Sequence, residues 1–421
     1  MAYTLISCVG TGMFVNKTTN EKEYRETTYL FPDGSKKRTK VFLEALLSCS
    51  NKSFDKIILV GTRTSNWGAL ICEKDFDDEN VFALYEKLYS SDKTENGIQE
   101  ENVAGLEEYL TKRFSVPVKL FISSALINED TALDLFSLYS SIVPEISPES
   151  NILFDITHSF RSIPILVYQA LQFSLDGNSS GRTVELVYGE YIDSDKVSYV
   201  RNLSKYWSFT QFSNALNLFA TKLDGFKLAA LIADEWPKGS KTIKRISEIT
   251  QLNFSIQIID VLHQIKNALK EFPAQENSLL LKTKSELEKL YAVYDEESLS
   301  KTFYNYSKFL HERNLNVQAV ITLQVAVEAC IIEKFANIDE QLGDYDWWQD
   351  YGNDNLKALT GDNWKEIGEP LRSLENFRNQ AAHGGAKDKK TKQYPSASNV
   401  DTIYCKGLKG VEKLFEAIKE L

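Results

Sequence analysis

The sequence predicts two fold classes in one chain: an α/β Rossmann-like N-terminal domain with a mostly parallel sheet, followed by an all-α helical domain. Two observations carry this prediction. Short apolar strand patterns alternate with helical patterns over about the first 200 residues, whereas after Trp207 only helical apolar periodicity remains. Strand–helix alternation is typical of parallel sheets with helices on both faces. At 421 residues the chain also exceeds one ordinary core, so two or three domains are expected.

The predicted sheet begins with four apolar runs bounded by Gly, Thr or Ser, at 4–9, 56–60, 118–122 and 152–156. Helical patterns between them predict helices at 39–47, 81–89, 103–114 and 131–142. Two further strand patterns, 183–191 and 196–202, predict a hairpin that closes one edge of the sheet.

The second half of the chain contains amphipathic patterns only. They predict helices at 209–223, 226–234, 243–252, 256–272, 285–294, 301–312 and 317–335. We therefore expect domains over 1–204, 205–300 and 301–421. Whether 205–300 is a helical connector or insert, or part of the same bundle, stays open at this point.

Composition limits the possible partners. A net charge of −11 argues against a long electrostatic track for nucleic acid, so any such contact is expected to be short, and no DNA partner is expected. No apolar run approaches the ~18 residues of a membrane span, and the N-terminus is expected to be a strand and not a signal peptide, so no membrane partner is expected. Five scattered cysteines without Cys-x-x-Cys spacing predict no metal and a reducing, cytoplasmic location.

Three loops follow predicted strands at the carboxyl edge, where open parallel sheets bind ligands. The candidate binding residues are Gly10, Thr11 and Gly12, then Thr62, Arg63, Ser65 and Trp67, then Thr157, His158, Ser159, Phe160 and Arg161. Hydroxyls, backbone amides and two arginines suit a phosphate-bearing ligand. The alternative is that Asp155, Thr157 and His158 merely fix a turn. Because no Gly-x-Gly-x-x-Gly follows the first strand, a dinucleotide-dependent oxidoreductase is disfavoured.

A second constellation lies near the C-terminus, where Arg378 and Asn379 precede His383 on a predicted helix. When a ribose 2′-hydroxyl attacks the adjacent phosphate, an imidazole can act as general base or acid and an arginine can stabilise the growing charge. Chance alone gives an Arg five residues before a His in about one such chain in ten. The alternative is a surface Arg and a His that interacts with the helix C-terminus.

Helix geometry predicts that the second constellation needs a partner copy. Arg378 and His383 lie about 140° apart around a helix and about 7.5 Å apart along it. A composite site made by two copies brings such groups together more easily, so we expect a homodimer. Lys387, Lys389 and Lys390 follow the motif and could hold RNA phosphates, although a solvated loop is the simpler interpretation.

At these residues the sequence resembles two known families. Asp155 to Arg161 resembles the Asp-x-Thr-His-Gly-Phe-Arg motif of CRISPR-associated sensor proteins with a CARF (CRISPR-associated Rossmann fold) domain, with Ser159 where the family usually has Gly. Tyr24-x-x-Thr27-Thr28-Tyr29-x-Phe31 and Gly61-Thr62-x-x-Ser65-x-Trp67 look like that family's other N-terminal signatures. Arg378-Asn379-x-x-x-His383 is similar to the Arg-x4-6-His motif of HEPN ribonucleases.

The resemblance implies a CARF-like sensor domain and a HEPN-like ribonuclease domain in a type III CRISPR antiviral protein. Such proteins are allosterically activated by cyclic oligoadenylate and cleave single-stranded RNA without metal. It implies that Arg378 and His383 are catalytic with Asn379 assisting, and that the three loops line the ring-binding cleft. Cyclic tetra-adenylate is favoured over hexa-adenylate. Two alternatives remain: a sensor domain that cleaves its own cyclic activator, and a non-catalytic ligand-sensing dimer scaffold.

Overall fold

The computed structural model describes residues 2–12, 14–15, 22–91, 97–124, 128–158, 161–175, 182–273, 278–382 and 399–419. The chain forms two compact units, Met1–Phe209 and Thr210–Leu421. The first is an α/β unit and the second is built of helices, which confirms the predicted fold class.

The first unit is built on an eight-stranded mixed sheet in the order β5-β4-β10-β9-β8-β1-β6-β7. Strands β9, β8, β1, β6 and β7 run parallel, so their carboxyl ends meet at one edge of the sheet. The strands are β1 (Tyr3–Val9), β4 (Thr27–Leu30), β5 (Lys36–Thr39), β6 (Phe54–Thr62), β7 (Val118–Ser123), β8 (Asn151–Asp155), β9 (Val184–Ile192) and β10 (Val197–Asn202), and a separate two-stranded ribbon contains β2 (Phe14–Val15) and β3 (Lys22–Glu23).

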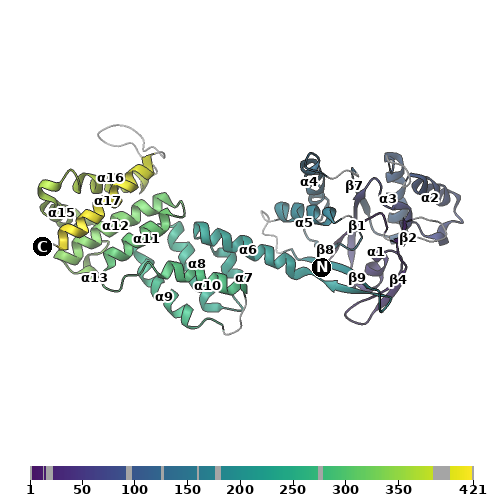
Figure 1. The fold of residues 1–421 in the computed structure, drawn as a ribbon, viewed down its shortest axis with the longest axis horizontal. Coiled ribbons are helices and arrows are strands. Elements are labelled where there is room, and N and C mark those ends of the chain that lie inside the picture. Colours follow the sequence, from purple (N-terminus) through teal and green to yellow (C-terminus); the bar gives the residue numbers. More distant parts are fainter. Residues whose placement is uncertain are drawn as a thin grey trace. The chain divides into compact units, whose positions relative to one another are not determined.

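Helices cover both faces of this sheet because successive strand residues point to opposite faces. Leu5 belongs to the core under α1 (Phe42–Cys49) and α3 (Glu100–Phe114), whereas Ile6 belongs to the core under α4 (Ala132–Ser140) and α5 (Ser162–Leu175) (Figure 1). The remaining helices of the unit are α2 (Glu79–Ser91) and the short turns η1 (Trp67–Leu70), η2 (Glu73–Asp75) and η3 (Val143–Glu145).

One side of the sheet differs from the prediction. The hairpin β9–β10 forms close to its predicted position, but it lies inside the sheet, because β10 pairs in parallel with β4 and β5 pairs with β4. The helix predicted at 39–47 begins only at Phe42, and β5 occupies the residues before it. Since β5 is a short, charged edge strand with Lys36, Lys37 and Arg38, it has no apolar run to reveal it.

The second unit has one continuous core. Leu262, Leu323 and Leu374 belong to the same buried cluster, so helices from the expected connector, 205–300, share a core with the helices after it. The helices are α6 (Ser204–Lys222), α7 (Phe226–Leu231), α8 (Pro237–Gln251), η4 (Ser255–Gln257), α9 (Ile258–Lys270), α10 (Ser278–Tyr291), α11 (Leu299–His311), α12 (Asn316–Phe335), α13 (Ile338–Gln341), α14 (Tyr345–Trp347), the π-helical turn η5 (Trp348–Gly352), α15 (Asn353–Thr360), η6 (Gly361–Asn363), α16 (Gly368–Ala382) and α17 (Val400–Lys419).

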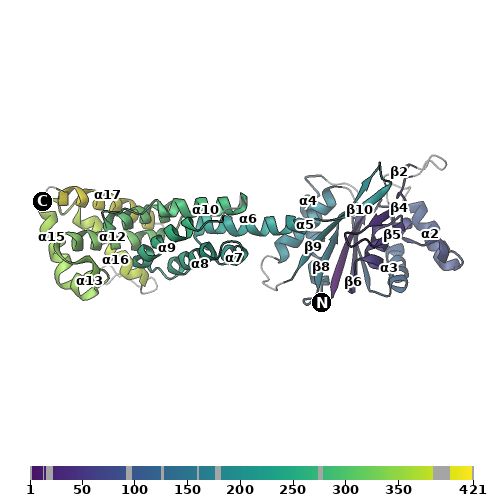
Figure 2. The ribbon, with the colours of Figure 1, turned by 90° about the horizontal axis from the view of Figure 1, so that it is seen from below.

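Helix α12 is the central helix of this unit and packs against α11, α16 and α17 (Figure 2). By length and composition it could cross a membrane, although the sequence was expected to hold no run long enough. Its most apolar 18-residue window is 72% buried by the rest of the chain, as in the core helix of a helical bundle.

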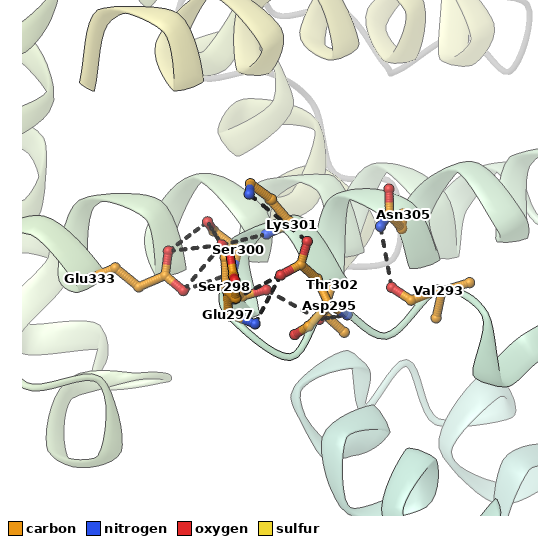
Figure 3. A network of polar contacts seen from close by, with 9 residues as sticks. All are labelled: Val293, Asp295, Glu297, Ser298, Ser300, Lys301, Thr302, Asn305 and Glu333. Carbon is orange, nitrogen blue, oxygen red and sulfur yellow. Dashed lines mark hydrogen bonds and ion pairs between the residues drawn. The ribbon is translucent and has the colours of Figure 1, made fainter. Parts of the chain in front are cut away.

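A polar network fixes the hairpin made by α11 and α12 (Figure 3). Ser298 caps α11, since its hydroxyl accepts a hydrogen bond from the Lys301 amide at 3.2 Å. Glu333 on α12 accepts hydrogen bonds from the Ser300 amide at 3.1 Å and the Ser300 hydroxyl at 2.6 Å. A carboxylate at a helix N-terminus is stabilising, so this network holds the amino end of α11 against α12.

Candidate functional site

The three predicted loops lie together at the carboxyl edge of the sheet. They follow β1, β6 and β8, and β1 pairs with both β6 and β8. The chain crosses from β7 at one edge to β8 on the far side of β1, so the strand order reverses beside β1. Open α/β sheets bind ligands at such a reversal point.

The loop after β6 is held to the loop after β1 by buried polar groups. The Ser65 hydroxyl donates to the Val9 carbonyl at 2.7 Å, and the Asn66 amide donates to the Gly10 carbonyl at 2.8 Å. The Trp67 indole donates to the Thr62 carbonyl at 2.8 Å. Because Thr62, Ser65 and Trp67 are all 0% exposed, these side chains shape the loop from inside. Their contact with a ligand stays a prediction.

Gly61 allows this close packing. A Cβ atom at this position would lie 2.8 Å from the Ser65 hydroxyl, 2.8 Å from the Trp67 ring and 3.0 Å from the Val9 carbonyl oxygen. Gly61 therefore explains why the signature Gly61-Thr62 requires glycine in its first position.

The loop after β8 is anchored by Asp155, which is 0% exposed. Its carboxylate accepts hydrogen bonds from the Ser7 hydroxyl at 2.6 Å and from the Thr157 amide at 2.8 Å. Burial raises the pKa of Asp155 to about 6, and these hydrogen bonds act in the opposite direction. The Thr157 hydroxyl in turn accepts from the Gly189 amide at 2.9 Å. Asp155 and Thr157 thus fix the turn, as the alternative interpretation expects.

His158 is clamped between two tyrosines that the sequence did not identify as site residues. The Tyr29 hydroxyl lies 3.1 Å from His158 Nε2, and the Tyr24 ring centroid lies 4.6 Å from that of His158. Burial lowers the pKa of His158 to about 4, so the imidazole is neutral at pH 7. Burial also raises the pKa of Tyr29, which keeps the phenol protonated.

Tyr24 connects His158 to the first loop. Its hydroxyl donates to the Gly10 carbonyl at 2.7 Å and accepts from the Gly10 amide at 2.8 Å. The Gly10 and Thr157 amides are both occupied within the chain, so neither is available to an anion in this state. The signal for Tyr24 and Tyr29 was present in the sequence, in the signature Tyr24-x-x-Thr27-Thr28-Tyr29.

Two arginines at this edge are exposed cations. Arg63 and Arg161 are exposed, and neither has a partner among the residues that the structure describes. Thr11 and Gly12 are partly exposed, whereas Gly10 is buried. Ser159 and Phe160 lie outside the described residues. Within the described part of the chain, two guanidinium groups without an ion pair thus lie beside hydrogen-bonded loops, which suits a phosphate-bearing ligand.

The second candidate site lies on α16 of the helical unit. Leu371, Leu374 and Phe377 are buried and form its apolar stripe. Arg378 follows them, and its Nη1 donates to Glu328 Oε1 on α12 at 2.5 Å. Asn379 is exposed, and its Oδ1 lies 3.4 Å from Arg378 Nη2.

Four predicted residues of this second site lie outside the described residues, namely His383, Lys387, Lys389 and Lys390. The other two histidines of this unit occupy structural positions: His263 packs against Tyr294, and His311 stacks on Tyr404 with ring centroids 4.1 Å apart. Among the described residues no group of three or more His, Cys, Asp or Glu side chains could hold a metal ion.

Comparison with known protein families gives a match to the α/β unit. Residues 4–195 match the family model described as CRISPR system endoribonuclease Csx1, CARF domain. CRISPR-associated protein MJ1674 of Methanocaldococcus jannaschii is 25% identical over 285 residues, which is 64% of this chain and 44% of that protein. The chain thus spans less than half the length of this relative.

Among solved structures, Enterococcus italicus Csm6 bound to cyclic hexa-2'-fluoro-hexa-dAMP aligns with this chain at a TM-score of 0.38 and 12% identity. The alignment covers 100% of this chain and 95% of that chain. The residues matched by the family model all lie in the first unit. Helices α7 to α17 come later in the chain and are not part of that match.

Proposed function

We propose that this chain, a CRISPR-associated protein with a CARF domain in its first unit, is an endoribonuclease activated by cyclic oligoadenylate. It cleaves single-stranded RNA without metal, and its activator is cyclic tetra-adenylate. The observation that carries the proposal is the combination of a CARF domain with the Arg378-Asn379-x-x-x-His383 motif on a helix of the second unit.

The sensor half of the proposal rests on charge. A cyclic oligoadenylate carries one phosphate per nucleotide, and Arg63 and Arg161 are exposed cations beside the loops after β6 and β8. In a chain of net charge −11, cations without an acidic partner among the described residues favour the binding of an anion. The buried hydrogen bonds of Ser65 and Asp155 keep both loops in place before the ligand arrives.

The ribonuclease half rests on the chemistry of the motif. The ribose 2′-oxygen attacks the adjacent phosphorus while an imidazole takes its proton, and the bond to the leaving 5′-oxygen breaks as that oxygen gains a proton. The products are a 2′,3′-cyclic phosphate and a 5′-hydroxyl. His383 supplies the imidazole, Arg378 stabilises the charge on the phosphate oxygens, and Asn379 assists by a hydrogen bond. Lys387, Lys389 and Lys390 hold further RNA phosphates.

A homodimer completes the proposal. The spacing of Arg378 and His383 around a helix favours a site shared by two copies. Among its described residues the α/β unit also exposes large apolar side chains: Leu133 is 73%, Ile165 57% and Phe173 72% exposed on α4 and α5, which pack together. Light scattering should give about twice 47.9 kDa, and a monomer mass would contradict the dimer.

The direct test is cleavage of a fluorescent RNA with cyclic tri-, tetra- or hexa-adenylate, in EDTA. We expect Arg378→Ala and His383→Ala to lower the rate about 10²-fold or more, since each removes a group that acts in the transition state. Arg372→Ala is the matched control, because Arg372 is an exposed arginine on the same helix without a partner among the described residues. Full activity of the Arg378 and His383 variants would contradict the proposal.

A further inference from the structure

Arg378 is fixed by a carboxylate from another helix. Its Nη1 donates to Glu328 Oε1 at 2.5 Å, and the two residues are 50 positions apart in the chain. The Glu328 side chain is 9% exposed and that of Arg378 20% exposed. The Gln324 amide, itself buried, donates to the same Glu328 oxygen at 3.3 Å.

A buried carboxylate in this place is costly by itself. Burial raises the pKa of Glu328, and the Arg378 charge and the hydrogen bonds act against that rise. A helix core that only had to be stable would hold an apolar side chain here. In the sequence, Glu328 is the one acidic residue inside the apolar stretch from Ala319 to Ile332.

The pairing leaves part of the guanidinium available. A guanidinium has five N–H donors in a rigid plane. One donates to Glu328, and a second makes only a long 3.4 Å contact with Asn379. The carboxylate therefore sets the plane and direction of the group and leaves donors for a phosphate.

We infer that Glu328 is a positioning residue: it orients Arg378 toward the scissile phosphate without touching RNA itself. This inference rests on the proposed ribonuclease function and adds a residue outside the Arg-x4-6-His motif. A competing role is a latch, in which Glu328 withholds Arg378 from the substrate.

The test compares Glu328→Gln and Glu328→Ala with wild type in the activated RNA-cleavage assay, with kcat and KM measured separately. We expect kcat of Glu328→Gln to fall about 10- to 100-fold with a much smaller change in KM, because the group is misplaced in the transition state. The kcat of Glu328→Ala should fall further, because the Gln side chain of Glu328→Gln keeps a hydrogen-bond acceptor for Arg378 and Ala does not. Unchanged kcat, or the rise expected of a released latch, would overturn the inference.

Glu333→Gln is the matched control for stability. Glu333 lies five residues further along α12 and binds Ser300 instead of Arg378. The substitution Glu333→Gln should lower the melting temperature without lowering kcat. If Glu333→Gln lost as much kcat as Glu328→Gln, both substitutions would act only through stability. That result would contradict a positioning role for Glu328.

A measurement without RNA separates this inference from the proposed function. If Arg378 and Glu328 form a buried pair, Arg378→Ala leaves a carboxyl without its partner, and adding Glu328→Gln should raise the melting temperature of that variant again. Absence of RNA cleavage by wild type would refute the proposed function. Absence of this rescue would refute the orientation of Arg378 by Glu328, whatever the activity.

Discussion

The half-buried His158 and the buried Asp155 are two titratable groups whose pKa values move in opposite senses. Burial lowers the pKa of His158 to about 4 and raises that of Asp155 to about 6. The stability that His158 contributes is therefore present above its unfolded value of about 6.5 and is lost as pH falls toward 4. The stability that Asp155 contributes is present below its unfolded pKa of about 3.9 and is lost as the pH rises through 6.

These signs predict the effect of His158→Asn. Between pH 7 and pH 5, wild type should lose about 1–2 kcal/mol more unfolding free energy than the variant, because only wild type must keep an imidazole neutral on folding. Urea unfolding of both proteins at the two pH values measures this difference. Parallel pH dependence would show that His158 is solvated and not held by Tyr24 and Tyr29.

Residue-level predictions from sequence depend on local motifs. Arg63, Arg161 and Arg378 were each selected from their own neighbours in the chain, and their contact with phosphate stays a prediction. Glu328 could not be found in this way, because it meets Arg378 only through the packing of α12 on α16. Its only signal was a carboxylate inside the apolar stretch from Ala319 to Ile332.

At the scale of elements, α11 depends on a capped amino end. Its N-cap residue Ser298 accepts a hydrogen bond from the Lys301 amide, and Glu333 adds a carboxylate from α12. Ser298→Ala should therefore lower the free energy of unfolding by about 1 kcal/mol.

Thr221→Ala is the control for that substitution. Thr221 is an exposed residue on α6 whose hydroxyl donates to the Asn217 carbonyl of its own helix, so its loss should change stability little. Chemical denaturation of both variants measures the effect. Equal stability of Ser298→Ala and wild type would show that the cap in Figure 3 contributes nothing.

The elements found from sequence were those with a clear period. The core strands β1, β6, β7 and β8 appear within three residues of their predicted bounds, because buried strands are continuous apolar runs. Strand β5 was missed because Lys36–Thr39 is a short edge strand and mostly charged, and β4, which has only four residues, was missed as well. This miss placed the β9–β10 hairpin at the edge, where β5 lies instead.

At the scale of the whole molecule, the proposed sensor and the proposed ribonuclease site lie in two different units of the chain. Allostery requires that the ligand change the activity of a distinct site. Arg63 and Arg161 belong to the first unit and Arg378 to the second, so substitutions can separate binding from catalysis. Arg63→Ala with Arg161→Ala should weaken activation by cyclic tetra-adenylate about tenfold or more while leaving the rate without activator unchanged.

Lys112→Ala is the control for these arginines. Lys112 is an exposed cation near the end of α3, which leads into the amino end of β7 and so lies at the opposite edge of the sheet. It should respond to activator as wild type does. A loss of activation equal to that of the arginine variant would point to a general charge effect.

The most direct measurement is the ratio of RNA cleavage rates of the full chain with and without cyclic tetra-adenylate, in EDTA. If cyclic oligoadenylate activates the ribonuclease, this ratio should be well above ten in wild type. It should fall toward one in the double variant that carries both Arg63→Ala and Arg161→Ala. A wild-type ratio of one with every ring size, or cleavage that EDTA abolishes, would contradict the proposed function.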